Sequence, residues 1–175
     1  MENILISVVV PVYNVEAYLE ETLESILSQR EINSENIEVL LINDGSTDNS
    51  GIICDEYMKK YSDVIRVFHK ENEGLLLTRR FGFAHAKGKY ILNCDSDDTL
   101  EPNMLSELVG VINATNADVI IYNVNMWDGN NKTTFYSNVF TTENMCSIEK
   151  PDLLREYFKS PNVVSMWGKI FKKKC

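Results

Sequence analysis

The sequence predicts an α/β protein, a Rossmann-like three-layer sandwich with a mainly parallel sheet and helices on both faces. Between residues 4 and 122, apolar stretches of strand length alternate with amphipathic stretches of helix length, which is the rhythm of βαβ units. The apolar stretches are nearly continuous, as expected for strands that are buried on both faces. The chain has 175 residues, enough for one domain with a substantial core.

The first expected strand covers residues 4–10, which are rich in branched apolar side chains, and Pro11 is expected to end it. Asn14 is the expected N-cap of the first helix. Apolar residues between positions 18 and 27 recur there at helical spacing, and glutamates occupy the opposite side. This segment therefore predicts a helix with one face packed on the sheet.

The same pattern then repeats along the chain. Helices are expected around Ile52 and Tyr57, over residues 74–86, and from Pro102 onward, since proline is favoured in the first turn of a helix. Further strands are expected over residues 37–42, 64–68, 89–94 and 118–122.

The pattern changes near residue 125. We expect residues 1–124 to form the α/β core and residues 125–175 to form an appendage of the same domain. Within the appendage, residues 133–136 resemble a strand and residues 151–159 resemble a short helix.

Composition and charge narrow the function classes. The net charge is −9, which argues against general nucleic-acid binding. Four lysines near the C-terminus are expected to form a solvated end, with peripheral contact to an anionic membrane surface as the alternative; they are Lys169, Lys172, Lys173 and Lys174. No apolar run has the length of a membrane span.

The four cysteines lack the spacing of metal ligands, and the chain has only two histidines. We therefore expect reduced thiols in a cytoplasmic protein and no zinc site rich in histidine.

An acidic run, residues 93–98 with Asp95, Asp97 and Asp98, directly follows the apolar residues of the fourth strand. Two carboxylates about 5 Å apart repel by roughly 3 kcal/mol at an effective dielectric constant near 20. A hard divalent cation offsets such repulsion. The alternative is an acidic turn or helix cap, since aspartate favours both.

Two more polar loops follow strands that are expected to be parallel, so all three loops should open on one edge of the sheet. In the first loop, Tyr13 offers a flat face for stacking. In the second, Asp44 can accept a hydrogen bond from a nucleobase N–H, while Gly45 permits a tight turn. A turn-capping aspartate and a partly buried tyrosine are the structural alternatives.

The sequence contains no glycine-rich phosphate loop. A bound diphosphate would therefore depend on a metal at Asp95 and Asp97, on Arg79 and Arg80, or on a helix N-terminus. The alternative for the two arginines is a solvated helix face.

Five ordered motifs resemble those of the inverting family-2 glycosyltransferases, which have the GT-A fold. They span nearly the whole chain: residues 9–14, 43–48, 72–79, 88–98 and 167–171. The resemblance implies a sugar transferase that uses a nucleotide-diphosphate donor, most often a UDP-sugar, and either Mg²⁺ or Mn²⁺. It also implies a saccharide or lipid-linked acceptor and a role in polysaccharide assembly for the cell envelope, near the cytoplasmic membrane face.

The resemblance implies a role for each matching position. Asp97 would bind the metal together with Asp95, and Asp98 would face the donor sugar. Six residues would bind the nucleotide: Pro11, Val12, Tyr13, Asp44, Arg79 and Asp95.

The chain also departs from the family pattern. Arg80 replaces the usual asparagine, and Leu76 and Leu77 replace small residues, so some donor contacts are expected to differ. The family's catalytic base usually lies in an acidic segment after the Trp-x-Lys motif, so we expect it beyond residue 175 of a longer enzyme. Two alternatives remain open, a non-catalytic module that binds sugar nucleotides and a nucleotidyltransferase.

Overall fold

A computed structural model describes residues 4–29, 36–127, 132–135 and 168–173. The chain divides into two compact units. Unit 1 contains residues 1–118 and 171–175, and unit 2 contains residues 119–170.

Unit 1 is built on parallel strands in the order β3-β2-β1-β4. The strands are β1 (Ile6–Val12), β2 (Ile37–Asp44), β3 (Ile65–Lys70) and β4 (Tyr90–Asn93). All residues of β1, β2 and β4 are buried, which explains their continuous apolar sequences. The predicted α/β class with a mainly parallel sheet is confirmed.

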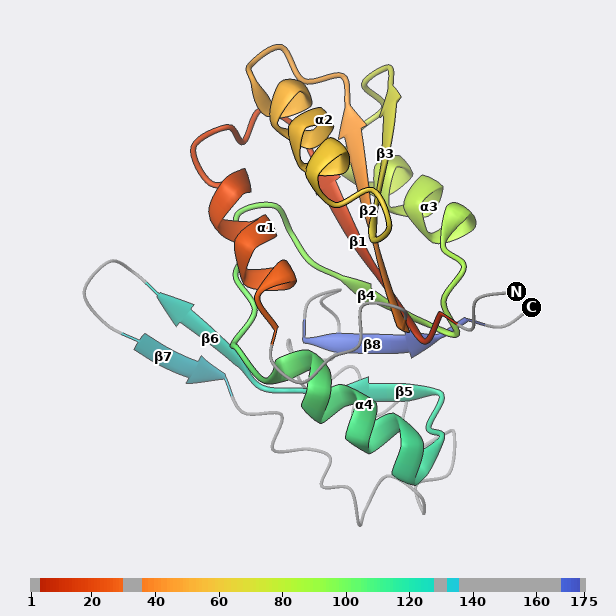
Figure 1. The fold of residues 1–175 in the computed structure, drawn as a ribbon. Coiled ribbons are helices and arrows are strands. Elements are labelled where there is room, and N and C mark those ends of the chain that lie inside the picture. The colour runs from red at the N-terminus through yellow and green to blue at the C-terminus, as the bar shows by residue number, and fades with distance from the viewer. Residues whose placement is uncertain (1–3, 30–35, 128–131, 136–167, 174–175) are drawn as a thin grey trace. The chain divides into compact units, whose positions relative to one another are not determined.

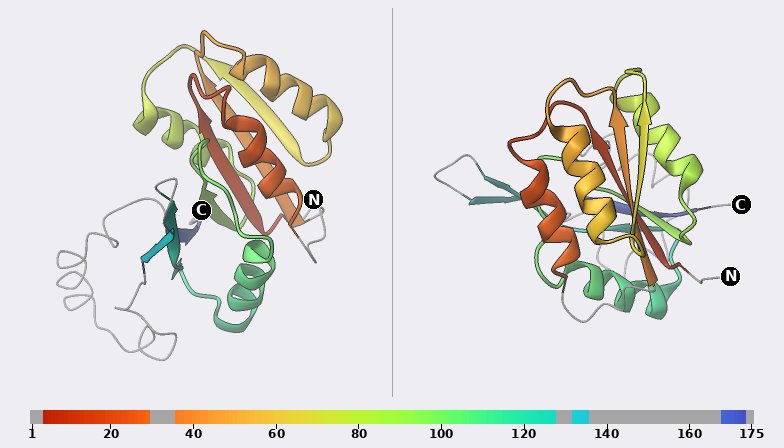
Figure 2. Two further views of the ribbon diagram at one scale, coloured as in Figure 1. Left: turned by 90° about the vertical axis from the view of Figure 1, so that its left-hand side faces the viewer. Right: turned by 45° about the horizontal axis from the view of Figure 1, so that its top comes forward.

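Helices cover both faces of this sheet (Figures 1 and 2). On one face lie α1 (Leu19–Leu27) and α2 (Ser50–Lys60), and on the other lies α3 (Leu75–His85). Helix α3 approaches the sheet closely at Gly82, because a Cβ atom there would lie 2.4 Å from a methyl group of Val9. Unit 1 also contains α4 (Met104–Thr115).

Two boundary predictions near the first loop are wrong. Pro11 lies inside β1 instead of ending it. It comes two residues after Val9, whose carbonyl accepts the Cys94 N–H. Residues two apart in a strand direct their backbone groups toward the same neighbouring strand, so Pro11 faces the side of β4. Strand β4 ends at Asn93, before it reaches the position opposite Pro11. The missing N–H of Pro11 therefore costs no hydrogen bond between strands.

Asn14 is not a helix cap. Helix α1 begins at Leu19, and its cap residue Tyr18 makes no side-chain capping hydrogen bond. The Asn14 side chain instead accepts the Thr47 N–H at 2.8 Å, in the loop after β2.

Unit 2 contains β5 (Val119–Ile121) and an antiparallel pair formed by β6 (Val124–Trp127) and β7 (Lys132–Phe135). Strand β7 contains residues 133–135 of the segment that was predicted to be strand-like. The predicted helix at 151–159 lies outside the described residues. Strand β8 (Lys169–Lys172) includes the last residues of unit 2 and the first of the C-terminal part of unit 1.

The described lysines near the C-terminus are not a free, solvated end. Lys169 is buried. Within unit 1, Lys172 donates to the Asn116 side chain at 3.1 Å, and Lys173 donates to the Ala86 carbonyl. In the part of the chain that the structure describes, no helix is long and apolar enough to cross a membrane.

The two described cysteines, Cys54 and Cys94, are free thiols and both are buried. Burial raises the pKa of the Cys54 thiol to about 12. Burial also raises the pKa of Cys94, and the nearby carboxylates of the acidic run add to this shift. Both thiols are therefore protonated near neutral pH and poor nucleophiles.

Candidate functional site

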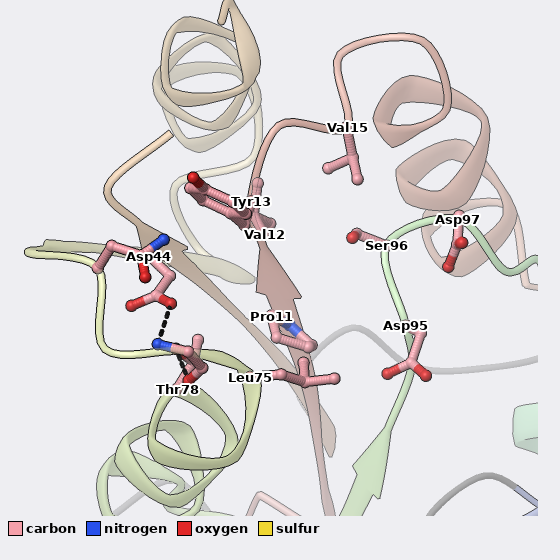
Figure 3. Close-up of a pocket in the computed structure, with 12 residues that line it drawn as sticks. Pro11, Val12, Tyr13, Val15, Asp44, Leu75, Thr78, Asp95, Ser96 and Asp97 are labelled. Atoms are coloured by element: carbon pink, nitrogen blue, oxygen red, sulfur yellow. Dashed lines mark hydrogen bonds between the residues drawn. The ribbon is translucent and has the colours of Figure 1, made fainter. Parts of the chain in front are cut away.

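A pocket of about 410 Å³ lies in unit 1 at the carboxyl ends of β1, β2 and β4 (Figure 3). It occupies the edge where open α/β sheets bind ligands. In Figure 3, Asp44 lies on one side of the pocket and the acidic loop on the other, with Pro11 and Leu75 between them. The lining residues are Pro11, Val12, Tyr13, Val15, Asp44, Asn72, Gly74, Leu75, Thr78, Asp95, Ser96 and Asp97.

The carboxylate of Asp44 is buried and well supplied with donors. It accepts the Lys70 ammonium group, the Glu73 N–H at 3.0 Å and the Gly74 N–H at 2.9 Å. Desolvation alone would raise the pKa of Asp44, but these hydrogen bonds outweigh it and lower the pKa below its ordinary value. Asp44 is therefore ionised near neutral pH.

In Figure 3, Tyr13 lies on the same side of the pocket as Asp44, and half of the residue's surface is exposed. Its loop is tied to the loop after β2, because the Asn14 N–H donates to the Ser46 hydroxyl at 3.1 Å and the Thr47 N–H donates back to Asn14. An exposed ring on an anchored loop can stack on a planar group without a large ordering cost.

The acidic loop is anchored by α1. The Thr22 hydroxyl donates to the Ser96 carbonyl at 2.9 Å, and the Leu100 N–H donates to the Ser25 hydroxyl at 3.0 Å. These bonds hold the loop beside the pocket and turn the Ser96 side chain toward it (Figure 3).

The aspartates of this loop differ in their surroundings. Oδ1 of Asp95 accepts the Arg79 guanidinium at 2.6 Å and the Asn93 amide at 2.9 Å. Asp97 is exposed, and its carboxylate makes no hydrogen bond or ion pair with the described residues. Desolvation, followed by repulsion from Asp95 and Asp97, raises the pKa of Asp98.

Two buried side-chain atoms near Asp95 lack a hydrogen-bond partner among the described residues: Nε of Arg79 and Oδ1 of Asn93. Both belong to side chains that contact Asp95 through their other atoms. Buried polar groups are normally satisfied, so the network around Asp95 has room for one further polar partner.

The donor set suits a hard divalent cation. Asp95 and Asp97 offer carboxylate oxygens on one side of the pocket, and Mg²⁺ is usually held by one or two carboxylates, substrate phosphates and water. Among the described residues no group of three His, Cys, Asp or Glu side chains could enclose a metal. The geometry therefore fits an ion shared with a phosphate-bearing ligand.

The structure brings together most of the residues that the sequence singled out. Those that line the pocket are Pro11, Val12, Tyr13, Asp44, Asp95 and Asp97. Arg79 does not line the pocket but contacts it through Asp95, and neither Arg80 nor Asp98 lines it.

Sequence reasoning assigned no role to the other six residues that line the pocket, which are Val15, Asn72, Gly74, Leu75, Thr78 and Ser96. Thr78 could have been found from its spacing, because it lies one helical turn after Gly74, the N-cap residue of α3. Val15 and Ser96 carry no comparable signal.

Comparisons with known proteins identify the family of the chain. A family model for glycosyl transferase family 2 matches residues 7–172. Glycosyltransferase GlyG of Streptococcus pneumoniae is 46% identical over 130 residues, which cover 72% of this chain and 42% of that protein. The minor teichoic acid biosynthesis protein GgaB of Bacillus subtilis is 34% identical over 146 residues, which cover 82% of this chain and 16% of that protein.

The fold is similar to that of S. aureus TarS, whose crystal structure in complex with UDP superimposes with a TM-score of 0.67 and 27% identity. The match covers 73% of this chain and 38% of that chain. The chain thus spans less than half the length of these relatives. Since the family match extends through both units, the chain belongs to glycosyl transferase family 2 and has a fold of the GT-A type.

Proposed function

We propose that this chain is the donor-binding part of a metal-dependent glycosyltransferase. It would transfer a sugar from a nucleotide-diphosphate donor, in the first place a UDP-sugar, to a saccharide or lipid-linked acceptor with inversion. The observation that carries the proposal is the pocket itself, which has an aromatic ring and a carboxylate on one side and two further carboxylates on the other. The TarS structures in complex with UDP and with UDP-GlcNAc support UDP as the nucleotide.

The nucleoside would occupy the side of the pocket with Tyr13 and Asp44. The tyrosine ring can stack on a base, and the ionised carboxylate can accept a ring N–H. Pro11 and Val12 would supply apolar contact near the base. Uracil, which carries one N–H between two carbonyl groups, suits a single acceptor at this position.

The diphosphate would face Asp95 and Asp97, which would hold Mg²⁺ or Mn²⁺. When bound, the cation neutralises the charge that develops on the leaving nucleoside diphosphate. Arg79 and Asn93 both donate to Oδ1 of Asp95, so Oδ2 would be the oxygen that binds the cation. Asp98 would lie on the donor-sugar side.

Inversion follows if the acceptor hydroxyl attacks the anomeric carbon once, from the face opposite the leaving group. A carboxylate base should remove the hydroxyl proton, and such a base typically contributes about 10²–10⁴-fold to the rate. We assign no described residue to this role.

We place the activity in polysaccharide assembly for the cell envelope, at the cytoplasmic side of the membrane. The similarity to a teichoic acid biosynthesis protein supports this assignment.

Calorimetry with UDP, in the presence of Mn²⁺ and then of EDTA, tests the metal role. UDP should bind with Mn²⁺, and Asp97→Ala should weaken that binding by about 100-fold or more, because a direct ligand is lost. Asp63→Ala, an exposed aspartate outside the pocket, is the matched control and should bind as the wild type does. Equal affinity with Mn²⁺ and with EDTA would reject the metal role.

Release of UDP from a panel of UDP-sugars tests for transferase chemistry. Slow release in the presence of Mn²⁺ supports a catalytic donor site. If UDP binds but no donor is cleaved, the chain acts as a binding module. Release of pyrophosphate from a nucleoside triphosphate and a sugar phosphate would instead indicate a nucleotidyltransferase.

A further inference from the structure

Lys70, the last residue of β3, has a largely buried side chain, of which only 10% is exposed. Its ammonium group contacts the Asp44 carboxylate, the Glu71 carbonyl oxygen at 2.6 Å and a carboxylate oxygen of Glu73 at 2.9 Å. An ammonium group has three N–H donors, so every donor of this lysine has an acceptor.

These contacts join three parts of unit 1. Asp44 is the end of β2, Lys70 is the end of β3, and residues 71–74 form the turn that leads into α3. Asp44 also accepts the Glu73 and Gly74 N–H groups. Lys70 therefore holds the first residue of the turn, and Asp44 holds its last two.

Gly45, in the loop after β2, lies close to the backbone of the same turn. A Cβ atom at this glycine would lie 2.9 Å from the backbone nitrogen of Asn72, and its φ of 70° is one that other residues rarely adopt. The loop after β2 and the turn before α3 are therefore packed backbone to backbone.

The turn and the start of α3 form one wall of the pocket. Asn72, Gly74, Leu75 and Thr78 all line it, whereas Lys70 does not. Any influence of Lys70 on a ligand must therefore act through Asp44 and this wall.

We propose that Lys70 is a positioning residue for the nucleoside side of the pocket. Its ammonium group supplies the positive charge that keeps the Asp44 carboxylate bonded to the turn. It thereby holds the carboxylate and the wall in the positions that would contact a nucleobase. Without it, Asp44 and Glu73 would be left as neighbouring carboxylates that repel one another. This inference rests on the proposed function, since it assumes that the nucleoside binds on the Tyr13 and Asp44 side of the pocket.

The test compares two ligands that share a diphosphate. Lys70→Met keeps an unbranched apolar stem of the same length, with sulfur in place of Cδ, and removes the ammonium group. We expect it to weaken Mn²⁺-dependent UDP binding by up to about tenfold, because the charge-assisted hydrogen bond that holds Asp44 in place is lost. Its affinity for pyrophosphate with Mn²⁺ should stay within about twofold of the wild type. Lys70→Arg restores the positive charge and should recover most of the UDP affinity.

Lys59→Met is the matched control, because this lysine is exposed on α2 and does not line the pocket. It should bind both ligands as the wild type does. Thermal unfolding of each variant shows whether it is folded, and Lys70→Gln, which keeps a donor toward Asp44, replaces the methionine variant if that variant fails to fold.

Unchanged UDP binding in Lys70→Met, or equal losses for UDP and pyrophosphate, would overturn the inference while leaving the proposed function intact. A wild-type chain that binds no UDP would instead reject the proposed function.

Discussion

Strand β2 has a buried carboxylate near each end, and the two differ in what surrounds them. Near the amino end, Glu38 accepts the Ser7 hydroxyl at 2.6 Å, the Arg66 guanidinium at 2.9 Å and the Lys87 N–H. At the carboxyl end, Asp44 accepts a lysine and two backbone N–H groups. Both side chains are almost fully buried, and in both the hydrogen bonds outweigh desolvation and lower the pKa.

Asp44 lines the pocket described above, whereas Glu38 does not. Burial, hydrogen bonds from several donors and a lowered pKa therefore do not by themselves distinguish a binding residue from a structural one in this protein. The position at the carboxyl edge of a parallel sheet does, because that is where loops from several strands meet. Glu38 should matter for stability alone, and Asp44 for ligand binding as well.

The largest predicted change is a loss of folding stability in Glu38→Ala. It leaves the Ser7 hydroxyl, the Lys87 N–H and part of the Arg66 charge without their acceptor. We expect a loss of about 3 kcal/mol in the free energy of unfolding, at the low end for a buried pair because Arg66 is partly exposed.

Chemical denaturation measures this loss, with Glu56→Ala, an exposed position on α2, as the control. UDP affinity of the folded Glu38→Ala protein should match the wild type. If Glu38→Ala lost UDP binding while keeping its stability, Glu38 would not be a purely structural residue, and the proposed difference between the two ends of β2 would be wrong.

The second effect concerns Asp44→Ala. We expect UDP binding to weaken by about tenfold and pyrophosphate binding with Mn²⁺ by about twofold or less, because the carboxylate lies on the nucleoside side. Calorimetry with both ligands gives the two ratios. If both ligands lost affinity to the same degree, recognition of the base by this side of the pocket would be excluded.

The smallest predicted change is in how the free energy of unfolding depends on pH in the acid range. Because the pKa values of Glu38 and Asp44 are lowered in the folded state, their contribution is complete above their ordinary values of 4.5 and 3.8. It is lost as the pH falls through the lowered values, since protonation then favours the unfolded chain.

Glu38→Gln removes one of these two contributions. The free energy of unfolding of this variant, measured by urea denaturation between about pH 6 and about pH 3, should fall less steeply than that of the wild type. Parallel curves for the two proteins would show that Glu38 is not a source of the acid sensitivity.

Much of unit 1 could be predicted from local sequence. Continuous apolar runs mark β1 and β2, and the helices between the strands predict that the strands are parallel, so the meeting of Tyr13, Asp44 and Asp95 at one edge could be anticipated. The errors arose where a distant partner decides the outcome. Pro11 stays in β1 because β4 is short, and Asn14 serves the loop after β2 instead of its own helix.

The sequence by itself determined the layered α/β class, the sheet edge that carries the pocket and the residue types gathered there, because periodicity and strand direction are encoded locally. Only the tertiary structure decided which charges are compensated. Lys70 reaches Asp44 across 26 positions of sequence and Arg66 reaches Glu38 across 28. Such pairs depend on the register of neighbouring strands, which follows from packing of the whole sheet and not from any short segment.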